Sequence, residues 1–172
     1  MNLISRITDY DILGERSELL HSVSRYGARG VLVDENFNIA MMHMTKRRLY
    51  KLPGGGIEGT ETPEEAFLRE VEEETGYRAK ITHPLGRIEE HKTKNQFLQL
   101  SYCFIAKSVE ENTVKLTAKE KQLGLTVIWM TMNEALTAMD RSFRNCREYS
   151  SKFMTLRDKT ILEQAITVLR GL

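Results

Sequence analysis

The stretch of sequence that decides the fold runs from Pro53 to Tyr77 and reads PGGGIEGTETPEEAFLREVEEETGY. Its second part has the start and stop signals of a helix. Thr62 to Glu65 supplies a capping box with proline at the first helical position, and Gly76 suits the C′ position, where a left-handed residue ends a helix. The sequence therefore predicts a helix over residues 63 to 75.

Three consecutive glycines precede this helix. Glycine adopts backbone angles closed to other residues and lets a ligand approach the backbone closely. We therefore expect Pro53 to Gly56 to form a loop, neither continuing a strand nor starting a helix.

Three glutamates occupy the last turns of the predicted helix, where cations are the favourable neighbours. Glu70 repels Glu74 at i,i+4 and Glu73 at i,i+3 by roughly 0.2–0.5 kcal/mol each. At 100° per residue, Glu74 lies about 40° from Glu70, and Glu73 about 60° to its other side, whereas Glu72 points away. A solvated helix face is the usual meaning of such a pattern, but a divalent cation would also offset the repulsion.

The residues at fixed positions in this stretch distinguish the two interpretations, because together they match a known motif. The matching residues are Gly55, Glu61, Arg69, Glu70, Val71, Glu73, Glu74, Gly76 and Tyr77. Their spacing resembles the Nudix box of MutT-like pyrophosphohydrolases, with Tyr77 standing where an aliphatic residue is commoner.

The resemblance implies an α/β fold, an α/β/α sandwich with a mixed sheet and a loop-helix-loop catalytic motif. It also implies Mg²⁺ or Mn²⁺ held by the carboxylates matching Glu70, Glu73 and Glu74, with the Gly55 backbone close to the metal. In the family, water attacks phosphorus in a diphosphate linkage while the metal neutralises phosphate charge and activates the water.

The remaining motif residues have supporting roles in the resemblance. Arg69 is similar to the family arginine that braces the carboxylates, although it could instead pair on the surface with Glu65 or Glu73. Glu61 is expected to support the loop or the outer metal shell, and Gly56 to serve loop geometry.

The general base stays open among three glutamates. Some family members use a glutamate of the helix, which would be Glu70 or Glu73, and others use one from a loop before a late strand. Glu120 has such a position, shortly before the expected strand Leu125 to Met130, and a solvated loop residue is its plain alternative.

Substrate-binding candidates lie just before the glycines. Lys46, Arg47 and Arg48 could contact phosphates beside an acidic metal site, although a solvated hairpin turn is the more common explanation of such a cluster. Tyr50 could stack on a base or ring, whereas aromatic residues in strands usually pack in the core.

The rest of the chain predicts one domain over residues 1–172, with a core about 24–140 and a C-terminal helix about 147–170. Apolar runs predict a hairpin within Arg29 to Met44, and strands over Ala79 to Glu90 and Gln96 to Lys107. A helix is expected near Asn133 to Met139, and Arg157-Asp158 is interpreted as a helix start.

Composition excludes several classes of protein. Among 172 residues, 25 Lys and Arg face 24 Asp and Glu, for a net charge of +1, which gives no electrostatic reason to expect nucleic acid or membrane as partner. With neither a signal-peptide pattern nor a clustered cysteine pattern, a cytoplasmic protein with two free thiols is expected; a homodimer stays possible.

Two other functions are compatible with the fold. A catalytically dead Nudix sensor would bind a nucleotide without hydrolysing it, but all box glutamates are present here. An isoprenoid diphosphate isomerase would need a catalytic cysteine, which neither Cys103 nor Cys146 suggests. Among hydrolase substrates, the proline markers of ADP-ribose and NADH hydrolases are absent, so nucleoside triphosphates and nucleotide sugars remain open.

Overall fold

A mixed eight-stranded sheet forms the centre of the computed structural model, which describes residues 1–172. The strands are β1 (Leu3–Thr8), β2 (Arg25–Val33), β3 (Ile39–Met44), β4 (Leu49–Lys51), β5 (Gly54–Gly56), β6 (Tyr77–Lys92), β7 (Phe97–Glu111) and β8 (Leu125–Met130). The main path runs β1-β6-β7-β2-β3-β4, while β5 pairs with β2 and β8 with β3. The pairs β1–β6 and β2–β7 are parallel and the others are antiparallel.

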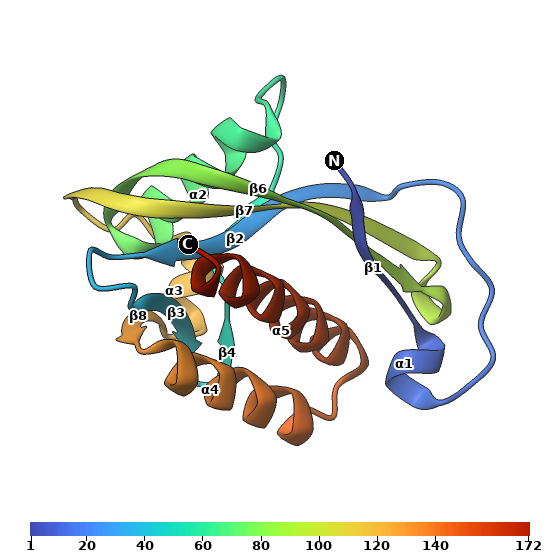
Figure 1. Cartoon of the computed structure of the whole chain (residues 1–172). Coiled ribbons are helices and arrows are strands. Elements are labelled where there is room, and N and C mark those ends of the chain that lie inside the picture. Colours follow the sequence, from blue (N-terminus) through green and yellow to red (C-terminus); the bar gives the residue numbers. More distant parts are fainter.

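Helices cover both faces of this sheet (Figure 1). They are α1 (Asp9–Leu13), α2 (Pro63–Thr75), α3 (Ala118–Gln122), α4 (Met132–Asn145) and α5 (Tyr149–Arg170), with a 3-10 turn at Thr93–Asn95. Helix α2 packs on one face, and α4 and α5 pack on the other. The predicted α/β/α sandwich with a mixed sheet is confirmed.

Strand β2 shows how alternation builds the two apolar layers. Ala28 and Leu32 join the cluster under α2, whereas Val31 and Val33 join the cluster under α4 and α5. Successive side chains of a strand point to opposite faces, so Arg29 faces the same side as Val31. This alternation directs the charged side chain of Arg29 toward the layer that contains α5.

The glycine segment differs from the expected loop. Gly54 to Gly56 form β5, which pairs antiparallel with Gly27 to Arg29 of β2. A Cβ on Gly54 would lie 2.3 Å from Cβ of Arg29. Glycine therefore permits the close approach of the two strands, and the prediction that these residues cannot belong to a strand was wrong.

The C-terminal helix also starts elsewhere than the charge pattern indicated. Helix α5 begins at Tyr149, where the Glu148 side chain accepts hydrogen bonds from the backbone N–H groups of Ser150 and Ser151. Arg157 and Asp158 lie in its middle and are buried. The two residues are an internal ion pair and do not mark the helix start.

At the N-terminus, β1 ends at Thr8 and α1 ends at Leu13 with Gly14 in a left-handed conformation. Tyr10 therefore belongs to a helix, and residues 15–20 form an irregular segment.

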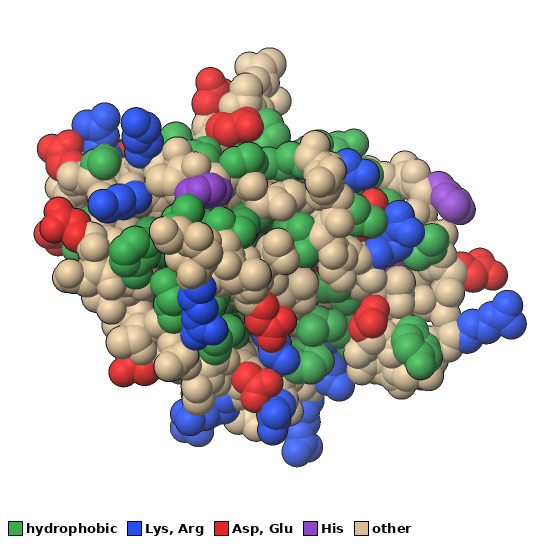
Figure 2. All heavy atoms as spheres, in the orientation of Figure 1, with side chains coloured by type: hydrophobic (Ala, Val, Ile, Leu, Met, Phe, Trp, Pro, Cys, Tyr) green, Lys and Arg blue, Asp and Glu red, His purple; other side chains and the backbone are tan.

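The surface is mixed in charge. On the face drawn in Figure 2, Lys and Arg side chains alternate with Asp and Glu, in keeping with the net charge of +1. None of the helices combines the length and the apolar composition needed to cross a membrane. Both cysteines are free and buried.

Candidate active site

The glutamate helix α2 begins and ends where its capping residues predicted. Thr62 and Glu65 form the reciprocal capping box, and Gly76 has a φ of 77° at the C-terminal cap. A Cβ at Gly76 would lie 2.8 Å from the backbone oxygen of Asn112. Glycine therefore both ends the helix and makes room for the segment that follows β7.

This segment carries Glu120 to the glutamates of α2. The Lys115 N–H donates to the Glu73 carbonyl at 2.7 Å, and the Asn112 side chain donates to Glu72 at 3.0 Å. The first bond satisfies a backbone carbonyl in the last turn of α2, which lacks a helical partner. Glu120 lies in the first turn of the short helix α3, where its backbone and side chain form a capping box with Thr117.

Three carboxylates converge between α2 and α3. One ligand atom each from Glu70, Glu74 and Glu120 lie within 4.8 Å of one another. Gly55 borders this carboxylate cluster, because a Cβ there would lie 2.3 Å from Oε1 of Glu70. An oxygen-rich set of this kind matches the ligands that hard divalent cations prefer.

Glu74 lies deepest in the carboxylate cluster. It is 2% exposed, and its Oε1 accepts a hydrogen bond from Lys51 Nζ at 3.0 Å. Burial raises the pKa of Glu74 to about 8, although the charge of Lys51 opposes the shift. Burial therefore outweighs the single ion pair, and further positive charge beside Glu74 would favour its ionised form.

Arg69 connects the glycine strand to α2 through hydrogen bonds. Its guanidinium donates to Glu61 at 2.7 Å, to Glu70 at 2.9 Å, to Glu73 at 3.2 Å and to the Gly56 carbonyl at 3.0 Å. The hydrogen bonds from Arg69 lower the pKa of Glu61. Arg69 and Glu61 thus hold the glycine strand against α2.

Glu73 differs from the other two helix glutamates, because it lies outside the carboxylate cluster while still lining the same cleft. Its Oε2 accepts from Arg69. Burial and the negative charges of Glu70 and Glu58 raise its pKa, against the effect of Arg69. Glu72 points away, toward Asn112.

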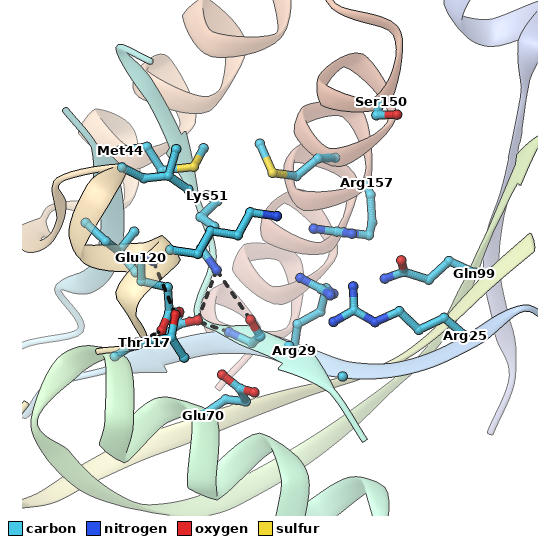
Figure 3. A pocket seen from close by; sticks show the side chains of 18 of the residues that line it. Arg25, Arg29, Met44, Lys51, Glu70, Gln99, Thr117, Glu120, Ser150 and Arg157 are labelled. Carbon is cyan, nitrogen blue, oxygen red and sulfur yellow. Dashed lines mark hydrogen bonds and ion pairs between the residues drawn. The ribbon is translucent and has the colours of Figure 1, made fainter. Parts of the chain in front are cut away.

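The carboxylates form one side of a cleft of about 770 Å³. Figure 3 shows Glu70 and Glu120 on one side, Lys51 near them, and Arg25, Arg29, Gln99 and Arg157 across the cleft. The residues of this second side were not predicted from the sequence. The available signal was the recurrence of arginine four residues apart in the apolar run of β2, which places both residues on one face.

The substrate-binding candidates separate into two groups. Arg47 lines the cleft, whereas Lys46, Arg48 and Tyr50 are not among its lining residues. The Tyr50 ring stacks on His43 with centroids 4.4 Å apart.

Comparison with known proteins places this architecture in a family. Residues 24–148 match the NUDIX domain model. A MutT-like protein of Streptomyces ambofaciens is 32% identical over 120 residues, covering 70% of each chain. An 8-oxo-dGTP diphosphatase of Proteus vulgaris is 29% identical over 92 residues, covering 51% of this chain and 81% of the relative.

Solved structures agree on the fold. A NUDIX hydrolase from Nitrosomonas europaea superposes with a TM-score of 0.62 at 18% identity, covering 86% of this chain and 89% of that one. A UDP-X diphosphatase superposes with a TM-score of 0.58 at 19% identity, covering 88% and 65%.

The α/β/α sandwich, with acidic residues delivered by a loop-helix motif, defines a class of hydrolases. Within that class, the chain belongs to the Nudix family of pyrophosphohydrolases.

Proposed function

We propose that the protein hydrolyses the diphosphate linkage of a nucleoside triphosphate or a nucleotide sugar in the presence of Mg²⁺ or Mn²⁺. The observation that carries the proposal is the convergence of Glu70, Glu74 and Glu120 at one side of a large cleft. Two of the similar proteins are named 8-oxo-dGTP diphosphatase and UDP-X diphosphatase, and both names denote cleavage of a diphosphate linkage.

The residues present fit a divalent cation. Three carboxylates would be costly to bring together without positive charge, and Lys51 compensates Glu74 only in part, since the pKa of Glu74 stays near 8. Glu70, Glu74 and Glu120 would hold the ion beside the Gly55 backbone. A cation bound there neutralises phosphate charge and makes water more acidic.

The protein's own side chains then have separable roles. Glu73 is the helix carboxylate outside the cluster, and it lines the same cleft, so its carboxylate is left free to accept a proton. We assign it to remove a proton from the water that attacks phosphorus. Arg69 holds Glu73 and Glu70 in place, and Arg47, which lines the cleft, is assigned to bind substrate.

The test is a hydrolysis screen of nucleoside triphosphates and nucleotide sugars with Mg²⁺ or Mn²⁺, with products separated by chromatography. Wild type should release a nucleoside monophosphate, and Glu74→Gln should be slower by at least a hundredfold. Glu73→Gln should remove the acidic limb of the pH profile of kcat. Absence of metal-dependent hydrolysis across the panel would refute the proposal.

A further inference from the structure

Five polar side chains gather on the sheet face that α5 covers, at the end of the cleft away from the carboxylates. Arg25 and Arg29 share this face of β2, and the parallel register sets Arg25 opposite Gln99 of β7. Lys92 of β6 and Arg157 of α5 also line the cleft, and both lie beside Glu90. We call Arg25, Arg29, Lys92 and Arg157 the cationic wall.

Arg29 is the unusual member of the cationic wall. It is 4% exposed, no carboxylate lies within ion-pair distance, and its one hydrogen bond runs from Nε to Ser101 Oγ at 3.3 Å. Burial and the charge of Arg157 lower its pKa, against the opposing charges of Asp158 and Glu90. Burying a charged guanidinium without a direct ion pair is costly, and Arg29 lines the cleft, so an anion bound there would stabilise it.

The two buried carboxylates nearby act on Arg29 through their charge, but both form their ion pairs with other cations. Arg157 binds Glu90 at 3.2 Å and Asp158 at 2.7 Å, and Lys92 Nζ lies 3.8 Å from the same Glu90. The second oxygen of Asp158 accepts the backbone N–H of Leu52 at 2.9 Å.

Four cations of the wall thus face two buried carboxylates, which leaves an excess of two positive charges. Burial lowers the pKa of Lys92, and the charges of Arg157, Arg29 and Arg25 add to this effect while Glu90 opposes it.

We infer that the cationic wall binds a phosphate group of the substrate other than those held at the carboxylate cluster. The inference rests on the proposed function, because both ends of one cleft then serve one ligand. A phosphate carries about two negative charges, which match the excess on the wall, and the planar fork of an arginine suits its oxygens. A nucleotide sugar with only a diphosphate lacks such a group, whereas a nucleoside triphosphate or a nucleotide derivative bearing a phosphomonoester has one.

The first test measures binding without metal, so that it is independent of hydrolysis. Inorganic phosphate is titrated in EDTA against a chloride solution of equal ionic strength, with affinity taken from calorimetry. Arg29→Gln should weaken phosphate binding at least tenfold, and Arg25→Gln should weaken it at least threefold. Arg78→Gln is the matched control, because Arg78 lies in an exposed pair with Glu110 and does not line the cleft.

Phosphate binding by wild type and Arg78→Gln, with loss in Arg29→Gln or Arg25→Gln, supports the inference. Wild type that binds phosphate no better than chloride overturns it, and so does equal binding in all four proteins. Because Arg29→Gln could fail to fold, Arg25→Gln at an exposed position keeps the test decisive.

The second test identifies the source of the phosphate. If the cationic wall binds the third phosphate of a nucleoside triphosphate, Arg29→Gln should lower the ratio of kcat/KM for a nucleoside triphosphate to kcat/KM for a nucleotide sugar at least tenfold. If the wall binds a phosphomonoester instead, the same ratio should fall when the first substrate is a nucleotide derivative that carries a phosphomonoester. Unchanged ratios for both substrates would overturn the inference, since the wall would then not distinguish an additional phosphate.

Discussion

Adding one methyl group at Gly55, as in Gly55→Ala, should lower the rate of hydrolysis without lowering the stability of the fold. A Cβ there would lie 2.3 Å from Oε1 and 2.6 Å from Cδ of Glu70, whereas ordinary contact begins at 3.4 Å. The carboxylate must therefore move by about 1 Å, a displacement that costs on the order of a hundredfold in rate when it affects a reacting group. The backbone itself tolerates alanine, because Gly55 does not have a positive φ.

Gly55→Ala should therefore keep the melting temperature of wild type within a few degrees while kcat/KM with Mg²⁺ falls by about a hundredfold. The matched control is Gly171→Ala, where the nearest atoms to a new Cβ lie 3.4 and 3.6 Å away at the end of α5. Equal kcat/KM in Gly55→Ala and Gly171→Ala would refute the reasoning. A lower rate caused only by unfolding would appear as a lost thermal transition.

Two further predictions concern buried charges. In EDTA, the free energy of unfolding should fall as the pH rises from about 4.5 to about 8, because the folded protein holds the Glu74 proton to a higher pH than the unfolded chain does. The contribution of Glu74 to this fall is at most about 5 kcal/mol. Urea denaturation of Glu74→Gln should lack this component, and identical pH dependence would contradict the assignment. Arg157→Met should lower the free energy of unfolding by about 3–5 kcal/mol, because Glu90 and Asp158 lose a buried partner; an unchanged urea midpoint would argue against it.

The glutamate helix was predictable because its signals are local. Thr62, Glu65 and Gly76 act within one or two turns, and the stripe of Glu70, Glu73 and Glu74 follows from helical periodicity alone. The structure nevertheless sets Glu73 apart from the other two. Its separation depends on Arg69 and on the approach of α3, neither of which periodicity describes.

Non-local pairing explains what the sequence did not reveal. The strand β5 exists because Gly54 to Gly56 pair with β2, although β3 and β4 lie between them in the sequence, and glycine patterning alone favours a loop. The cationic wall depends on the parallel register that sets Arg25 opposite Gln99, more than 70 residues away along the chain. Arg157 and Asp158 have the charge pattern of a helix end, and only burial against Glu90 identifies them as an internal pair.

Binding of Mn²⁺, followed by electron paramagnetic resonance, tests most directly whether carboxylates from α2 and α3 form one cation site. Glu120→Gln should weaken Mn²⁺ binding at least tenfold, since Glu120 lies within 4.8 Å of Glu70 and Glu74. Glu72→Gln carries the same charge change on α2 and should bind Mn²⁺ as wild type does, because its side chain contacts Asn112. Equal Mn²⁺ affinity in Glu120→Gln and Glu72→Gln would contradict the account.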